Sequence, residues 1–218
     1  MKIVEIFQSI DGEAVRAGGL ANFIRMAGCN LRCSYCDTDY ALEKSNGEEM
    51  SVEEILSKLD KKIKNITLTG GEPLWDRENA FILLKALVNS GYDVSVETNG
   101  SIELEKFIKN FPTVCFIVDY KSPSSGMERN MYINNFKILR KHDCVKFVVQ
   151  DKKDLEIMEK VCIDTGLNDG HIPIFLSAVF NKIELSTLVE FIMERKLTYI
   201  RLQIQMHKII WNPMLRGV

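Results

Sequence analysis

Three of the six cysteines are crowded into eight residues, where Cys29, Cys33 and Cys36 form a C-x3-C-x2-C group. Three thiolates from one loop can hold three corners of a [4Fe–4S] cluster and leave one iron free to bind a small chelating molecule. A structural zinc site would need a fourth ligand, and no other Cys or His is close in sequence. A thioredoxin-like dithiol would use Cys33 and Cys36 and leave Cys29 without a role.

Three further motifs follow predicted strands along the chain. They are Thr69-Gly70-Gly71-Glu72-Pro73, Glu97-Thr98-Asn99-Gly100 and Asp119-Tyr120-Lys121. Glycines let backbone groups approach a ligand closely, and the Glu72 carboxylate is an acceptor for an ammonium group. In α/β proteins the chemistry lies at the carboxyl ends of the strands, so we expect these motifs to meet the cysteine loop there.

Short β-rich runs alternate with helical patterns over the whole chain. Strands are predicted at 21–26, 64–69, 92–97, 114–119, 144–149, 172–177 and 198–203, and helices near 51–60, 78–90, 103–110, 130–141, 152–165 and 184–196. Most strands are almost entirely apolar, as in parallel sheets covered by helices. The pattern predicts an α/β fold. Six or seven units fit a partial or full α/β barrel better than a flat sheet, although periodicity cannot separate the two. Because the chain is small, we expect a partial, open parallel β/α barrel.

The composition is that of one globular domain. The chain has 218 residues, of which 46% are hydrophobic and 27% charged, and its net charge is -2. The high hydrophobic content excludes a disordered chain, and the slightly negative net charge gives no basic surface for nucleic acid. The apolar runs are shorter than the ~20 residues of a membrane span, and the N-terminus turns polar too early for a signal peptide. We therefore expect a cytoplasmic protein with no nucleic-acid or membrane partner.

The cysteine loop, with Tyr35 just before its last cysteine, resembles the signature of the radical S-adenosylmethionine (SAM) superfamily. The resemblance implies that the open iron chelates the amino and carboxylate groups of SAM. The reduced cluster then cleaves SAM and releases a 5′-deoxyadenosyl radical, which takes a hydrogen atom from the substrate. The Gly70-Gly71-Glu72 motif resembles the superfamily element that binds the SAM amino group, and the Glu97–Gly100 stretch resembles its ETNG/ETSG element.

The flanking segments narrow the resemblance to the 7-carboxy-7-deazaguanine synthases of queuosine and 7-deazapurine biosynthesis, in their Gram-positive-type form. The matching segments are 5–13, Phe23-Ile24-Arg25, Cys36-Asp37-Thr38 and the tail from Leu202 to Val218. This family is a group of radical SAM lyases that convert 6-carboxy-5,6,7,8-tetrahydropterin to 7-carboxy-7-deazaguanine with loss of ammonia. The resemblance implies a single radical SAM core domain over 1–218, with N-terminal and C-terminal substrate-binding extensions.

The resemblance also implies three sets of site residues, and it assigns no catalytic side chain because the cofactors carry the radical chemistry. The metal ligands are Cys29, Cys33 and Cys36 for the cluster and Thr38 for Mg2+. The SAM-binding set is Tyr35, Cys36, Asp37, Gly71, Glu72, Glu97, Asn99, Asp119, Tyr120, Lys121, Leu176, Ser177, Ala178 and Val179. The substrate-binding set is Ile10, Asp11, Gly12, Glu13, Arg25, Thr69, His207 and Val218, of which the last two lie in a tail that closes over the substrate.

The chain departs from the family pattern at two positions. Asp11 stands where most members have Gln, and Asp119-Tyr120-Lys121 replaces the usual Ser-Pro-Lys. An ionised Asp11 only accepts hydrogen bonds, which suits the amino and N–H groups of a pterin. Arg25 suits a substrate carboxylate. Taken without the resemblance, Glu13 and Arg25 would equally be interpreted as a surface ion pair.

Two alternatives remain open at this stage. The first is a radical SAM activase that acts on a protein, of the glycyl-radical-enzyme activating type. The second is a non-catalytic iron–sulfur or zinc-binding module, which would not bind SAM. For a synthase, the resemblance implies an external one-electron donor of flavodoxin or ferredoxin type and a homodimer.

Overall fold

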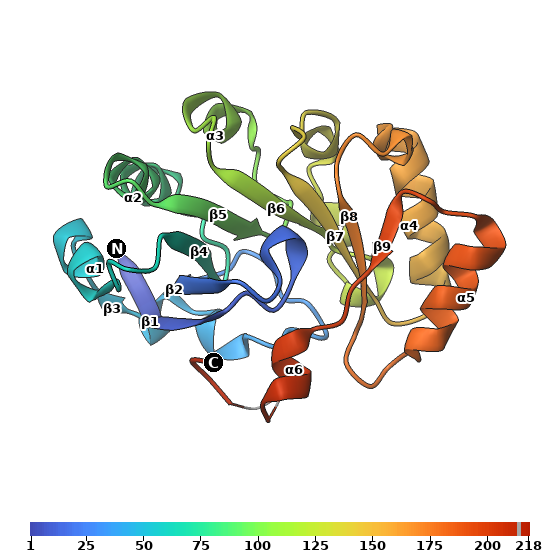
Figure 1. Ribbon diagram of the computed structural model, residues 1–218, viewed down its shortest axis with the longest axis horizontal. Coiled ribbons are helices and arrows are strands. Elements are labelled where there is room, and N and C mark those ends of the chain that lie inside the picture. Colours follow the sequence, from blue (N-terminus) through green and yellow to red (C-terminus); the bar gives the residue numbers. More distant parts are fainter. Residues whose placement is uncertain (213–214) are drawn as a thin grey trace.

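The computed structural model describes residues 1–212 and 215–218. Within them the strands form a single sheet in the order β3-β1-β2-β4-β5-β6-β7-β8-β9 (Figure 1). Strands β2 and β4 to β9 run parallel, while β1 is antiparallel to both β2 and β3. The two ends of the sheet, β3 and β9, do not pair with each other. The predicted open, partial β/α barrel is therefore confirmed.

The parallel strands lie where the apolar runs predict them, within two residues at each end. The strands are β1 (Lys2–Ile10), β2 (Leu20–Met26), β3 (Glu48–Glu49), β4 (Asn65–Gly70), β5 (Asp93–Thr98), β6 (Cys115–Tyr120), β7 (Cys144–Val149), β8 (Ile174–Ala178) and β9 (Ile200–Leu202).

Helices cover the outer side of this sheet (Figure 1). They are α1 (Val52–Lys58), α2 (Arg77–Asn89), α3 (Glu105–Asn110), α4 (Lys152–Thr165) and α5 (Leu185–Arg195), while the short α6 (Met206–Ile210) lies apart from them, near the C-terminus. Short 3-10 segments lie in the loops between strands or between a helix and a strand: η1 (Ala14–Arg16), η2 (Asp39–Ala41), η3 (Lys44–Asn46), η4 (Pro123–Ser125), η5 (Glu128–Asn130), η6 (Ile133–Lys137) and η7 (Leu167–Asp169). The start of α1 is a capping box, in which the Ser51 hydroxyl accepts from the Glu54 N–H at 3.2 Å.

The helix predicted at 130–141 is wrong, because this segment forms only the 3-10 turns η5 and η6. The reason is Asn135, whose buried side chain is committed to tertiary hydrogen bonds. Its amide donates to the carbonyls of Gly100 (3.1 Å) and Ile102 (2.8 Å) and accepts from the Leu104 N–H (2.9 Å). These bonds satisfy the backbone of a neighbouring loop and override the local helical pattern.

Three elements were not predicted as such. Strand β1 begins the chain and pairs with β2 from Ile3 opposite Met26 to Ile10 opposite Leu20. Strand β3 has two residues and α6 has five, which is too short for a periodic signal. The loop between β1 and β2, in blue, lies in front of the sheet in Figure 1.

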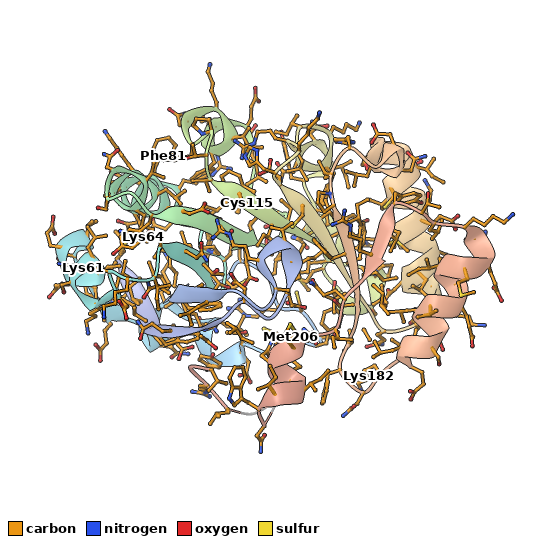
Figure 2. All side chains as sticks on the ribbon, viewed as in Figure 1. Lys61, Lys64, Phe81, Cys115, Lys182 and Met206 are labelled. Carbon is orange, nitrogen blue, oxygen red and sulfur yellow. The ribbon has the colours of Figure 1, made fainter. Side chains whose placement is uncertain are left out.

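The inner face of the sheet carries polar side chains at alternate positions of the parallel strands. Thr67 and Thr69 of β4, Glu97 of β5, Asp119 of β6 and Lys146 of β7 are all on this side, and the outer face packs against the helices. Beneath these polar side chains lies a small apolar cluster of Ala14, Cys115, Ile117, Cys144 and Phe175. Figure 2 shows Cys115 among the strands. The polar inner face is what positions the site. None of the helices in the described part of the chain is both long and apolar enough to cross a membrane.

Candidate active site

A cavity of about 330 Å³ lies at the carboxyl ends of the parallel strands and is bordered by the C-terminal segment. It gathers most of the residues that the sequence assigns to a site. Those that line it are Ile10, Asp11, Gly12, Glu13, Arg25, Cys29, Cys33, Tyr35, Cys36, Asp37, Thr38, Thr69, Gly71, Glu97, Asn99, Asp119, Lys121, Val179, His207 and Val218. The N-terminal loop, the cysteine loop and the tail therefore meet in one place.

Five of the predicted residues do not line this cavity: Glu72, Tyr120, Leu176, Ser177 and Ala178. The Tyr120 ring packs against Phe136 and Phe147, and its hydroxyl donates to Glu128 Oε1 at 3.2 Å. The Leu176 side chain is fully buried in the core. For these two residues, the structure shows packing on the side of the strand away from the cavity.

The glycines of the Gly70-Gly71-Glu72 motif allow two loops to pack backbone against backbone. A Cβ atom at Gly71 would lie 2.3 Å from the carbonyl oxygen of Gly28, just before Cys29. Two hydrogen bonds join the loops, from the Gly71 N–H to the Met26 carbonyl (3.0 Å) and from the Glu72 N–H to the Gly28 carbonyl (2.8 Å). The absence of side chains at these glycines thus lets the cysteine loop pack against the end of the next strand. This role is separate from the predicted one, which is to let a ligand approach the backbone closely.

Glu72 is fully enclosed by donors from its own chain. Its carboxylate accepts from the N–H groups of Leu74 (3.0 Å) and Asn99 (2.6 Å) and from the Thr98 hydroxyl (2.8 Å). Burial, partly opposed by these bonds, raises the pKa of Glu72 to about 7. In this structure Glu72 therefore holds the turn at Thr98 and Asn99.

Asn99 connects this turn to the first cysteine. Its amide nitrogen lies 3.8 Å from Cys29 Sγ and donates to Asn30 Oδ1 at 3.1 Å. The Leu31 N–H also points at Cys29 Sγ, at 3.4 Å. N–H groups directed at a sulfur are typical of cysteines that ligate iron–sulfur clusters, because they stabilise the thiolate.

The donor set of the cysteine loop fits a [4Fe–4S] cluster. Cys29, Cys33 and Cys36 are free thiols, and all three line the cavity. Burial raises the pKa of each thiol, and a bound metal reverses that preference by favouring the thiolate. In residues 1–212 and 215–218 no three His, Cys, Asp or Glu side chains converge on a point that would hold a single ion. A cluster does not require this, since each thiolate binds a different iron.

The residues after the cysteine loop contact the C-terminal helix. The Thr38 hydroxyl donates to Asp37 Oδ1 at 3.1 Å, and Lys208 Nζ of α6 lies 2.7 Å from Asp37 Oδ2. Desolvation works to raise the pKa of Asp37, but the Lys208 ammonium, the Thr38 hydroxyl and His207 together outweigh it and lower that pKa to about 2. One hydroxyl and one carboxylate thus lie side by side at the predicted Mg2+ position, and both are oxygen donors of the type that ion prefers.

The Asp11 side chain lines the cavity, and one of its two carboxylate oxygens already accepts a hydrogen bond. Its Oδ1 accepts from the Thr67 hydroxyl at 2.7 Å, while the buried Oδ2 has no hydrogen-bond partner among the described residues. Burial raises the pKa of Asp11 to about 6, with Glu97 adding to the effect and Thr67 opposing it. A buried acceptor of this kind requires a donor from a ligand.

A buried chain of charges runs across the floor of the cavity. Lys146 Nζ lies 2.6 Å from Glu13 Oε2 and 3.7 Å from Asp119 Oδ1, and Lys121 Nζ donates to Asp119 Oδ2 at 2.7 Å. Glu13 Oε1 and Asp119 Oδ1 have no hydrogen-bond partner within the described chain. Lys146 therefore links Glu13, predicted to bind the substrate, to Asp119, predicted to bind SAM. The sequence analysis missed it, although a lone lysine in an apolar strand was a signal of a buried ion pair.

Arg25 forms its ion pair with Glu5, and not with Glu13 as considered from the sequence. Its Nε donates to Glu5 Oε1 at 2.6 Å, so the Glu13–Arg25 surface pair is wrong. The Arg25 guanidinium also lies over the rings of Phe7 (5.8 Å) and Tyr40 (5.7 Å). Its position against these rings leaves it at the cavity wall, where it lines the space beside the tail.

The tail closes one side of the cavity. The Arg216 guanidinium stacks 3.9 Å from the centre of the Tyr40 ring, on which Arg25 also lies, and Val218 lines the cavity. His207 belongs to α6 and sits against Gly12, where a Cβ atom would lie 2.6 Å from His207 Nδ1. Tyr40 and Lys208 also line the cavity but were not predicted; neither stands in a motif that marks it out.

Comparison with known proteins places this geometry in a family. The model of the radical SAM superfamily matches residues 23–143. A 7-carboxy-7-deazaguanine synthase of Clostridium acetobutylicum is 46% identical over 221 residues, covering 100% of this chain and 99% of that protein. A 7-carboxy-7-deazaguanine synthase of Koribacter versatilis is 34% identical and covers 100% of each.

A solved structure has the same fold. The crystal structure of QueE from Escherichia coli superposes with a TM-score of 0.72 over 94% of each chain, at 24% sequence identity. At this identity the match supports the open barrel and not the individual residues.

Proposed function

Since the chain belongs to the radical SAM superfamily and, within it, to the 7-carboxy-7-deazaguanine synthases, we propose that it is a radical SAM lyase that contracts the ring of 6-carboxy-5,6,7,8-tetrahydropterin to give 7-carboxy-7-deazaguanine and ammonia. One observation carries the proposal. The three cysteines and the polar N-terminal loop line the same cavity, so a cluster-bound cofactor and a polar ligand would lie side by side. An activase for a protein substrate has no need of this loop.

The residues of this chain would bind and orient the reactants. Cys29, Cys33 and Cys36 would hold a [4Fe–4S] cluster, which with SAM supplies the hydrogen-abstracting chemistry when bound. Asp119 and Lys121, whose side chains line the cavity next to the cysteine loop, would contact SAM. Asp119 Oδ1, which lies 3.7 Å from Lys146 Nζ and has no hydrogen-bond partner in the described chain, would accept from an ammonium or hydroxyl donor.

The substrate-side residues fit a molecule that carries N–H donors and a carboxylate. Asp11 Oδ2 and Glu13 Oε1 are buried acceptors without partners in the described chain, and each would accept from an N–H or amino group of the pterin. The Arg25 guanidinium would pair with the substrate carboxylate. The tail residues Arg216 to Val218 would exclude water from the reacting atoms.

The proposal is tested by anaerobic reconstitution with iron and sulfide, followed by product analysis with SAM, a chemical reductant and the carboxy-pterin. The expected product is 7-carboxy-7-deazaguanine, formed with one ammonia per turnover. Absence of this product from a reconstituted protein that still cleaves SAM would refute the proposed substrate. Formation of a glycyl radical on an added protein under the same conditions would support the activase alternative.

Thr38 is proposed to be the Mg2+ ligand, and Thr38→Ala should weaken the response to that ion. We expect the Mg2+ concentration for half-maximal activity to rise about tenfold, while iron content and SAM cleavage without substrate stay at the wild-type level. Thr38→Ser, which keeps the hydroxyl, is the matched control. An unchanged Mg2+ titration for Thr38→Ala would remove Thr38 from the metal site.

Asp11 should make pterin binding depend on pH. Because its pKa lies at about 6 in the free protein, the carboxylate is protonated below this value and loses acceptor capacity. Binding should therefore tighten as the pH rises through about 6 and level off above pH 7, whereas Asp11→Asn should lack this component. The measurement is the pterin dissociation constant of both proteins between pH 5 and 8. Glu97, Arg16 and Lys146 face Asp11, and their contributions are shared by the two proteins. A pH dependence that is the same in both would contradict the prediction.

We also propose a cytoplasmic location, a homodimer and a flavodoxin- or ferredoxin-like electron donor. The family resemblance supports the last two. Sedimentation of the reconstituted protein tests the dimer, and turnover with purified flavodoxin in place of the chemical reductant tests the donor.

A further inference from the structure

Ala14 has a strained backbone that one distant side chain holds in place. Its φ is 61°, in the left-handed region that residues with a Cβ avoid, and the residue is buried. The Gln203 amide binds both of its backbone polar groups. The Ala14 N–H donates to Gln203 Oε1 at 2.6 Å, and Gln203 Nε2 donates to the Ala14 carbonyl at 3.2 Å. The Gln203 backbone is itself fixed, since its N–H donates to the Leu176 carbonyl of β8 at 2.9 Å.

This clamp bridges the gap between the ends of the open sheet. Gln203 follows β9 at one end, and Ala14 lies in the loop between β1 and β2 near the other. Two further contacts lie beside it: the Met206 N–H donates to the Gly12 carbonyl at 3.3 Å, and His207 packs against Gly12. Figure 2 shows Met206 at the start of α6, below the blue loop. The N-terminal loop is therefore held by the C-terminal segment.

Two acceptors of the cavity lie next to the clamp in sequence. Glu13 directly precedes Ala14, and its carboxylate meets Lys146 at 2.6 Å. Asp11 lies three residues before Ala14 and meets Thr67 at 2.7 Å. Neither Gln203 nor Ala14 lines the cavity, so their effect on a ligand is indirect. If the peptide at Ala14 relaxed toward an ordinary φ, the direction of the loop from 11 to 13 would change.

We propose that Gln203 is a positioning residue for substrate binding: by holding Ala14 in the left-handed conformation, it orients the carboxylates of Asp11 and Glu13 toward the substrate. The inference rests on the proposed function, because the carboxy-pterin is the ligand whose binding would report the effect. It adds to that function a residue outside the cavity and a physical link between the two chain ends.

The kinetic test uses Gln203→Met, which keeps the length of the side chain and removes the amide. We expect KM for the carboxy-pterin to rise about tenfold, as the loss of two ordinary hydrogen bonds allows, with kcat within about twofold of wild type. Affinity for SAM and SAM cleavage without substrate should stay unchanged. Gln8→Met is the matched control, because the Gln8 amide bonds Asn22 Oδ1 (3.1 Å) and does not touch Ala14, and its KM should not change.

A second substitution separates this role from general loss of structure. Glycine adopts a positive φ without steric cost. In Ala14→Gly the backbone at position 14 should therefore keep its conformation even without the two hydrogen bonds from Gln203. Combined with Gln203→Met, it should return KM to within about threefold of wild type, whereas alone it should change KM by less than about twofold. A KM unaffected by Gln203→Met, or a rise that Ala14→Gly does not reduce, overturns the proposal. So does a parallel loss of SAM affinity.

Hydrogen exchange gives a readout that does not depend on turnover. The Ala14 amide should be protected in the wild type and should exchange at least about tenfold faster in Gln203→Met. If the wild type does not convert the pterin, the proposed function fails, and exchange at Ala14 still decides whether the clamp exists. Equal exchange in the two proteins overturns the clamp even if the pterin is turned over.

Discussion

Cys33→Ala should leave the anaerobically reconstituted protein without its brown chromophore and without SAM cleavage. Two thiolates cannot complete the three-ligand loop of a [4Fe–4S] cluster, and no other cysteine lines the cavity in the described chain. We expect residual product formation to fall at least about 10³-fold, because the radical chemistry belongs to the cofactor. Iron and sulfide content, visible absorbance and SAM cleavage are the measurements.

Cys162→Ala is the matched control for this experiment. Cys162 is a fully buried free thiol of α4 that packs in the core and is not among the residues that line the cavity. Its removal should cost some stability and leave the chromophore intact. Retention of both the chromophore and SAM cleavage in Cys33→Ala would show that the ligand assignment is wrong.

Lys146→Met should have the second largest effect. Lys146 is buried against Glu13 and Asp119, and removing one partner from a buried ion pair costs on the order of 3–5 kcal/mol. Asp119 keeps Lys121 at 2.7 Å, but Glu13 loses its nearest cation and would rotate or take up a proton. We expect kcat/KM for the pterin to fall about 100-fold or more, since a misoriented Glu13 would lose the contact with the substrate that we propose for it.

Two further variants identify the cause. Lys146→Arg keeps the charge and should retain more activity than Lys146→Met. Glu13→Gln removes the charge that needs compensation, so the double variant Lys146→Met with Glu13→Gln should be more stable than the sum of the single effects predicts. Thermal unfolding of the reconstituted proteins measures this. Strict additivity of the two changes would contradict a direct interaction between Lys146 and Glu13.

The fold was largely predictable because the parallel strands pack against helices and are therefore visible in the sequence as short apolar runs. The strand at 144–149 and the helix at 152–165 have the predicted bounds. The helix predicted at 130–141 does not form because the Asn135 side chain hydrogen-bonds the backbone of a loop that is distant in sequence. No local sequence pattern reveals such a bond.

Motifs at strand ends and the family resemblance together predicted which segments meet at the cavity, while the binding roles of their residues stay predictions. The cysteine loop, the Asp11–Glu13 loop and the tail were all placed at one cavity. What could not be predicted are the partners of charged groups, which depend on which strands are neighbours. Arg25 meets Glu5 and not Glu13, while Glu13 meets Lys146 from a strand more than 130 residues away. The clamp from Gln203 to Ala14, over 189 residues, is of the same kind.

The contact between the Gly70-Gly71 turn and the segment from Met26 to Gly28 is made of main-chain atoms on both sides. Because the joint uses only the backbone of residue 26, another apolar side chain that fits the core at this position should leave it intact. The two glycines have no such freedom, since even one methyl group would push the neighbouring loops apart and shift the sulfur atom that follows. We therefore expect substitutions at Gly70 and Gly71 to be tolerated less well than an apolar replacement at position 26, although Gly70 and Gly71 are not predicted metal ligands.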